Sequence, residues 1–140
     1  MATDFGLSTS GTEVIFASCC DERFGYENIV DGNDRTFWVT TGLYPQQFIM
    51  QFQGEIEINK VKTVTTNVRR ILVEKCNAMT PASFDKVYDV EVADRAGRLQ
   101  IETNSFPTPV AARFLRITIE SGWDDFASVH RVSLEGTAVS

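Results

Sequence analysis

At 140 residues, with 43% hydrophobic and 23% charged residues, the chain has the size and composition of one globular domain, expected to span residues 1–140. Its net charge of −6, with Lys and Arg scattered along the chain, argues against nucleic acid or an anionic membrane as the partner. No apolar run approaches the roughly 18 residues of a membrane helix, and the N-terminal residues show no signal-peptide pattern.

The first half of the chain contains several short runs with the pattern of strands. Residues 13–19 form an apolar, β-branched run, and residues 47–52 alternate so that Phe48, Met50 and Phe52 share one face. Residues 61–68 and 71–76 continue this pattern, with Gly54 and Asn59 as interruptions before them.

The second half continues in the same way. Runs at 86–93 and 99–103 flank a turn at 94–97, as in a hairpin, and the two prolines of 105–109 exclude that segment from a central strand. Residues 113–120 place Leu115, Ile117 and Ile119 on one face, and residues 128–134 close the chain. The sequence therefore predicts an all-β fold of about eight antiparallel strands, a β-sandwich of jelly-roll type.

The three cysteines are odd in number, and Cys19 and Cys20 are adjacent, so a bridge between these two is strained. Free thiols in a reducing compartment fit this pattern better than a disulfide framework, and we expect an intracellular protein.

Residues 27–38 are the most distinctive stretch of the chain. Three acidic residues, two asparagines and a threonine surround Gly32, and the stretch ends on Phe37 and Trp38. Calcium prefers such oxygen-rich loops, but an Asx-rich turn without an ion has the same composition. The stretch is not an EF-hand, because Thr36 stands where that loop needs glycine and Gly42 where it needs glutamate.

The spacing Asn28, Asp31, Gly32, Asn33, Thr36 and Trp38, followed by residues 44–52, resembles the discoidin or coagulation-factor C-type group of galactose-binding-like jelly rolls. The resemblance implies a structural calcium ion held by Asn28, Asp31, Asn33 and Thr36. Sugar-binding members of that group usually add a glutamate five residues before a terminal glycine. Arg131 stands there instead, so carbonyl groups around 128–130 are candidates to complete the site.

The blocks at 8–15, 27–42 and 126–137 are similar to one family of intraflagellar transport subunits. That resemblance implies a non-enzymatic subunit of the B complex, paired with a Rab-like small GTPase (intraflagellar transport protein 27). It also implies a location in the cilium or flagellum, the basal body region and the cytoplasm. A role in exporting signalling receptors and the BBSome from cilia follows from the same resemblance.

The alternative function is an intracellular carbohydrate-binding module. Phe24, Tyr44 and Trp123 are expected in loops, where aromatic side chains stack on sugars, contact other proteins or fill the ends of the sandwich. The sequence shows no grouping of these aromatics with Arg, His or Asn on one rim. On outward faces, Ile49, Tyr88 and Phe114 are candidate partner contacts.

An enzyme is the third possibility and the least favoured. His130 is the only histidine, so no zinc cluster forms around it, and a Cys19–His130 or Cys76–His130 nucleophile pair is only formally possible.

Overall fold

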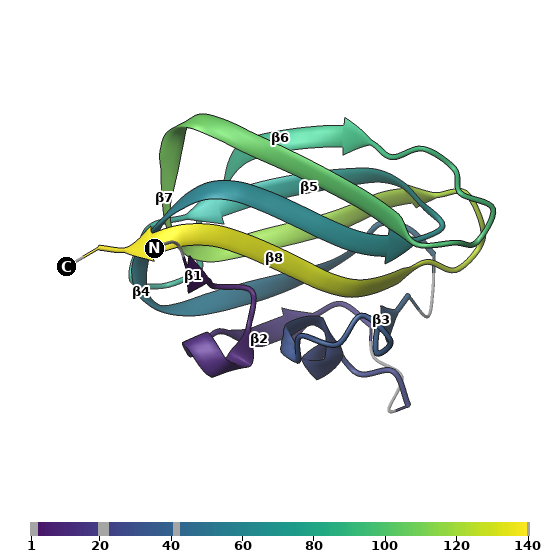
Figure 1. Cartoon of the computed structure of the whole chain (residues 1–140), viewed down its shortest axis with the longest axis horizontal. Coiled ribbons are helices and arrows are strands. Elements are labelled where there is room, and N and C mark those ends of the chain that lie inside the picture. Colours follow the sequence, from purple (N-terminus) through teal and green to yellow (C-terminus); the bar gives the residue numbers. More distant parts are fainter. Residues whose placement is uncertain (1–2, 20–22, 41–42, 140) are drawn as a thin grey trace.

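Two long strands, β4 (Gln46–Thr66) and β7 (Gln100–Gly122), pair along most of their length in the computed structural model, which describes residues 3–19, 23–40 and 43–139. Their ladder shifts register between Gln51 and Ile56 and again between Ile58 and Lys60. Such irregularities bend a sheet. Both strands bend sharply, at the left of Figure 1, so each contributes to both layers of the fold.

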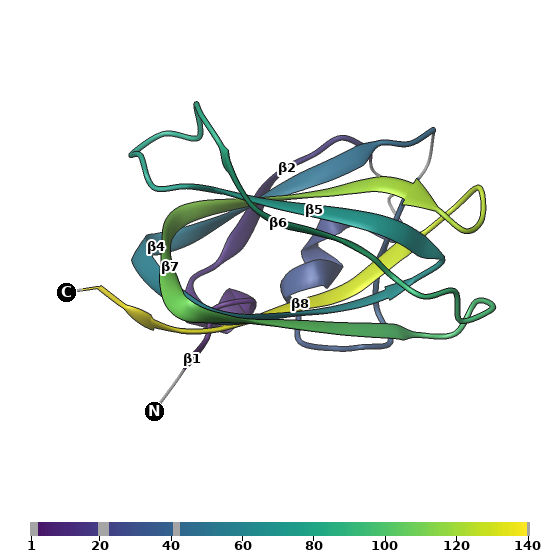
Figure 2. The ribbon, with the colours of Figure 1, turned by 90° about the horizontal axis from the view of Figure 1, so that it is seen from above.

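The remaining strands extend the two layers, and every pairing is antiparallel. The first layer adds three strands to the start of β4 and the end of β7: β2 (Glu13–Ala17), β5 (Val68–Cys76) and β6 (Asp85–Glu91). The second layer adds three strands to the end of β4 and the start of β7: β1 (Thr3–Asp4), β3 (Trp38–Val39) and β8 (Ser128–Ala138). Figure 2 shows the two layers stacked. The predicted all-β jelly roll is confirmed.

The core lies between the layers and is formed by the apolar residues that occupy alternate positions of the strands. Phe48, Met50 and Phe52 of β4 are at most 3% exposed, as predicted for one face of a strand. The predicted face of β7 (Leu115, Ile117 and Ile119) is equally buried, and Val132 and Leu134 of β8 cover the core from the second layer.

Element boundaries differ from the prediction in three places. The runs at 47–52 and 61–68 belong to one strand, because Gly54 and Asn59 lie within β4 at its bend and do not end it. The strand ends before Asn67, whose φ of 57° starts the turn into β5. Residues 105–109 lie in β7, but the ladder has no partners for residues 106–109, which accommodates both prolines.

The other local predictions concern turns, helices and thiols. Ala96 and Gly97 have φ values of 54° and 85°, which confirms the turn at 94–97. The helices are two 3-10 segments, η1 (Ser8–Ser10) and η2 (Tyr26–Val30), and no helix in the described ranges is long and apolar enough to cross a membrane. Cys19 and Cys76 are free thiols, as predicted; Cys20 and Gly42 lie outside the described residues.

The three candidate partner contacts on outward faces have different environments. Phe114 is only 3% exposed, beside Met79 at a small hollow, so its prediction as an exposed contact is wrong. Tyr88 is half-buried with its ring centroid 5.9 Å from that of Phe106, and burial raises the pKa of its phenol to about 12. Ile49 is half-buried.

Candidate functional site

The oxygen-rich loop lies between η2 and β3, and both of its ends are fixed in the core. Ile29, at the end of η2, and Trp38, the first residue of β3, are 0% exposed. Trp38 pairs with Val129 of β8, so the loop is held against the C-terminal strand. A loop with buried anchors on both sides keeps its polar side chains in a defined arrangement.

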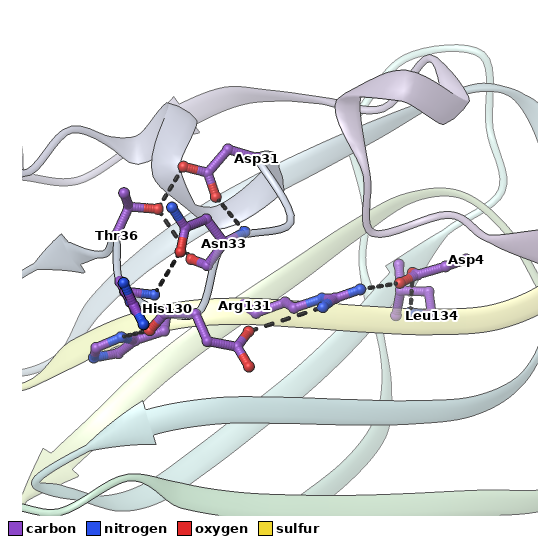
Figure 3. A network of polar contacts seen from close by, with 9 residues as sticks. Asp4, Asp31, Asn33, Thr36, His130, Arg131 and Leu134 are labelled. Atoms are coloured by element: carbon purple, nitrogen blue, oxygen red, sulfur yellow. Dashed lines mark hydrogen bonds and ion pairs between the residues drawn. The ribbon is translucent and has the colours of Figure 1, made fainter.

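Three of the four residues expected to bind calcium come together in this loop. The carboxylate of Asp31 accepts a hydrogen bond from the Asn33 main-chain N–H at 2.9 Å, and the Thr36 hydroxyl donates to its other oxygen. The same hydroxyl oxygen lies 3.0 Å from the Asn33 carbonyl oxygen. A carboxylate, a hydroxyl and a main-chain carbonyl therefore converge, and Figure 3 shows this cluster above β8.

Asn28 has a different role in the loop. Its amide donates to the carbonyl oxygen of Phe37 at 2.9 Å, across nine residues, and so ties the end of η2 to the entry of β3. The side chain of Asn33 accepts from the Arg35 main-chain N–H at 2.9 Å, so it is the carbonyl of Asn33 that faces the cluster.

The oxygen donors of this cluster fit a hard cation. Calcium takes about six to eight oxygen ligands, including carbonyl and hydroxyl groups. Asp31 supplies the only carboxylate seen in the cluster, and no group of three His, Cys, Asp or Glu side chains suited to a metal occurs in the described ranges. Any ion at this loop is therefore held mainly by neutral oxygens.

Strand β8 reaches the loop through side chains. His130 Nδ1 lies 2.7 Å from the carbonyl oxygen of Asp34, which only accepts, so the ring carries its proton on that nitrogen. One nitrogen of the Arg131 guanidinium lies 3.8 Å from the Asp34 carboxylate, and another lies 3.0 Å from the Asp4 carboxylate. A cation therefore lies beside the loop at the position where sugar-binding relatives are expected to carry an acid.

Arg131 joins three distant parts of the chain. Asp4, besides its ion pair with Arg131, accepts hydrogen bonds from the main-chain N–H groups of Gly6 and Leu134 at 2.8 and 3.0 Å. The side chains of Arg131 and Asp4 are each about one quarter exposed, so water screens their ion pair less than one at the surface. It fastens the N-terminal strand and the loop to β8 (Figure 3).

We expect Arg131→Ala to lower the free energy of unfolding by about 1–2 kcal/mol, because the Asp4 carboxylate keeps its main-chain bonds but loses its counter-charge. Urea unfolding measures the change, and faster hydrogen exchange at Phe5, whose N–H donates to the Leu134 carbonyl, reports where it acts. Lys60→Ala is the control, because it removes an ion pair whose side chains are about half exposed. If Lys60→Ala lowers the free energy of unfolding as much as Arg131→Ala, the Arg131 ion pairs have no special role in stability.

A hollow of about 310 Å³ lies next to the loop at the same end of the sandwich. Its walls are mostly apolar side chains with a few polar groups: Phe37, Val39, Thr66, Asn67, Phe126, Ala127, Ser128 and His130. Aromatic rings, a histidine and an asparagine thus share one rim, a grouping that the sequence did not reveal. They come from the end of the loop before β3, the β4–β5 turn, the β7–β8 loop and β8, and no short-range pattern links them.

Ser128 and His130 form a hydrogen-bonded pair of the kind that could hold a nucleophile and a base. The Ser128 hydroxyl lies 2.9 Å from His130 Nε2, but it is also bonded to the Thr66 hydroxyl, and both side chains are below 9% exposure. The other ring nitrogen faces a main-chain carbonyl, where a triad places a carboxylate. The thiols of Cys19 and Cys76 have carbonyl partners, Val39 and Thr80, and neither is bonded to His130.

The three loop aromatics are held by contacts within the chain. Phe24 stacks on Phe37 with ring centroids 4.6 Å apart, which puts it beside the hollow. The Trp123 N–H donates to the Val92 carbonyl at 2.8 Å, and the Tyr44 hydroxyl donates to the Asp124 carbonyl at 3.0 Å. Tyr44 and Trp123 therefore help to close the end of the sandwich.

Comparison with known proteins identifies what the chain is similar to. The family model described as "F5/8 type C domain" matches residues 13–132. Over 95% of its length the chain is 43% identical to "Intraflagellar transport protein 25" of Chlamydomonas reinhardtii, covering 69% of that protein. It is 40% identical over 98% of its length to "Intraflagellar transport protein 25 homolog" of Homo sapiens, covering 94% of that protein.

Solved structures resemble the chain in fold. The family 32 carbohydrate-binding module of NanJ from Clostridium perfringens, solved in complex with galactose, superposes with a TM-score of 0.80 at 16% identity, over 96% of this chain and 99% of that one. A chitosan-binding module from Paenibacillus sp. IK-5 gives a TM-score of 0.79 at 18% identity, over 97% and 100% of the two chains. At these identities the likeness concerns the fold alone.

Proposed function

The chain belongs to the F5/8 type C domain family and to the family of intraflagellar transport protein 25, and from this membership we propose that it is a non-enzymatic subunit of the intraflagellar transport B complex. In this proposal it pairs with a Rab-like small GTPase (intraflagellar transport protein 27) in the cilium or flagellum. Through that pair it supports the export of signalling receptors and the BBSome. The single observation that carries the proposal is the identity of 40–43% over nearly the whole chain.

The structure supports an adaptor in two ways. Antiparallel pairing joins the strands into one continuous sheet, and buried apolar side chains fill the space between its two layers, which gives a partner a well-defined surface. Large apolar side chains nevertheless remain exposed, among them Ile101 and Phe126 at 59% and 58%, which is typical of a surface that another protein covers.

Co-expression with the GTPase tests the proposal. We expect an equimolar complex that elutes as one species in size-exclusion chromatography and persists in 1 M salt, because an apolar interface is little weakened by screening. Separate elution of the two proteins at micromolar concentration contradicts the pairing.

Calcium is the second part of the proposal. The converging oxygens of Asp31, Asn33 and Thr36 would hold the ion, and its role would be to stiffen the loop against β8. A bound ion would supply only its positive charge, which holds these oxygens together, and would take part in no reaction. Arg131 lies close enough to Asp34 to hold that carboxylate away from the cluster.

We expect calcium at about 100 times its dissociation constant to raise the melting temperature by roughly 8 °C, since such saturation adds about 2.7 kcal/mol. Asp31→Ala removes the only carboxylate of the cluster and should abolish this rise. Asp34→Asn is the matched control and should retain it, because that carboxylate faces Arg131. A rise that survives in Asp31→Ala, measured by differential scanning fluorimetry with calcium and with chelator, contradicts the site.

An intracellular carbohydrate-binding module remains the alternative, and the hollow is the observation that favours it. Phe37, Phe126, Asn67 and His130 line one rim, as in a sugar site that combines stacking with hydrogen bonds. Saturable binding of galactose in calorimetry, lost in Phe126→Ala, would support this function.

A further inference from the structure

The bend of β7 exposes a threonine between two prolines. Pro107, Thr108 and Pro109 are all exposed, and the ladders of β7 with β4 and β5 have no partners for residues 106–109. The segment lies where β7 passes from one layer to the other, at the left of Figure 1. Thr108 is therefore accessible on a stretch of main chain with which no neighbouring strand pairs.

The two prolines hold this stretch extended. A proline fixes its own φ and restricts the residue before it to extended conformations, and both Phe106 and Thr108 precede a proline. A protein kinase needs an accessible hydroxyl that reaches its catalytic aspartate and the γ-phosphate of ATP. Pro109, directly after the threonine, offers no N–H. An enzyme that acts on Thr108 must therefore accept a proline at the next position, as a proline-directed protein kinase does.

A lysine without a counter-charge lines the same hollow as Thr108. This hollow, of about 520 Å³, is separate from the one beside the oxygen-rich loop, and its walls include Phe106, Val87 and Lys75. Lys75 is half-buried on β5, and its ammonium group lies 3.4 Å from the Ala111 carbonyl oxygen. It forms no ion pair with any residue in the described ranges. The hollow therefore contains a cation that can bind an anion.

The other charges around the hollow leave this role to Lys75. Lys86 of β6 also lines the hollow, but its ammonium group lies 3.1 Å from the Asp89 carboxylate. Asp85, the cross-strand neighbour of Lys75, is exposed and is not among the residues that line the hollow. A second exposed threonine followed by proline, Thr80, lies outside this hollow.

We propose that Thr108 is a phosphorylation site for a proline-directed protein kinase and that Lys75 binds the phosphate, a modification that goes beyond the proposed function. The threonine oxygen attacks the γ-phosphorus of ATP, the bond to ADP breaks, and the hydroxyl proton passes to the catalytic aspartate of the kinase. The phosphate carries a charge of about −1.5 to −2 at neutral pH. Its charge-assisted hydrogen bond to Lys75 joins the bend of β7 to β5 across the hollow.

The first test incubates the full chain with ATP and a mitogen-activated protein kinase and locates phosphate by peptide mass spectrometry. We expect phosphate on Thr108 in the wild type and in Thr80→Ala, the matched control that removes the other exposed threonine–proline pair. Thr108→Ala should lose it. A peptide of residues 103–113 is phosphorylated in parallel. Absence of phosphate on Thr108 in the folded chain, with or without phosphate on the peptide, overturns the site.

The second test measures the pKa of the phosphate by phosphorus NMR. Because a nearby cation favours the doubly charged form, the phosphate on Thr108 of the chain should titrate about 0.5–1 pH unit lower than that on the peptide. The difference should shrink in 1 M salt and disappear in Lys75→Met, which keeps an unbranched apolar stem.

Lys62→Met, at an exposed position of β4, is the control for the loss of one charge and should keep the lower pKa. Circular dichroism melting checks that both lysine variants are folded. An equal pKa in chain and peptide, or a lower pKa that survives in Lys75→Met, overturns the role of Lys75 and leaves the phosphorylation of Thr108 standing.

Discussion

Replacing Trp38 by alanine is expected to lower the free energy of unfolding by about 3–5 kcal/mol and the melting temperature by roughly 10–15 °C. The indole is 0% exposed, meets the ring of Phe48 edge-on with centroids 5.3 Å apart, and donates its N–H to the Cys19 carbonyl at 2.9 Å. Alanine leaves a large cavity under the oxygen-rich loop and an unpaired carbonyl. Urea unfolding followed by far-UV circular dichroism measures the loss.

Trp38→Phe separates the contribution of ring packing from that of the indole hydrogen bond. It keeps an aromatic ring against Phe48 but removes the donor to Cys19, so we expect a smaller loss of about 1–3 kcal/mol. Trp38→Ala should also reduce the stabilisation by calcium, because Trp38 fixes the end of the loop. A loss below 1 kcal/mol in Trp38→Ala would contradict the assignment of this residue as the main anchor.

Gln100→Leu is expected to lower the free energy of unfolding by about 2–4 kcal/mol. The amide is 2% exposed, and its oxygen accepts from the Thr65 hydroxyl and the Val68 N–H at 2.9 and 3.0 Å. Its nitrogen donates to the carbonyls of Val68 and Ala93 at 2.7 and 3.0 Å. Leucine fills similar space but leaves these buried groups without their partner.

The four bonds of Gln100 hold the β4–β5 turn, which carries two residues of the hollow, against the segment after β6. Gln53→Leu, at an exposed position of β4, is the control and should change stability by less than about 0.5 kcal/mol. If Gln100→Leu and Gln53→Leu lower the free energy of unfolding equally, the four buried hydrogen bonds of Gln100 contribute little to stability.

Local patterns were sufficient to predict much of the fold. The alternation of Phe48, Met50 and Phe52, and that of Leu115, Ile117 and Ile119, identified buried faces correctly, because side-chain direction in a strand depends only on neighbouring residues. The turn at 94–97 followed from its Asp and Gly residues in the same way. The spacing of Asp31, Asn33 and Thr36 anticipated that these residues meet, since all three lie in one short loop.

The tertiary structure decided everything that depends on strands far apart in the chain. Phe114 was expected at the surface, but alternation indicates only two opposite faces and not whether the outer one is covered; Phe114 is 3% exposed, and Met79 from the loop after β5 lies beside it. The contacts of Arg131 with Asp4 and Asp34 span 127 and 97 residues, which no local pattern encodes. The register of β4 against β7 and β8 brought Ile101 and Arg131 beside Val64. Sequence alone determined which residues are apolar and where strands form; register and bulges determined which of them meet.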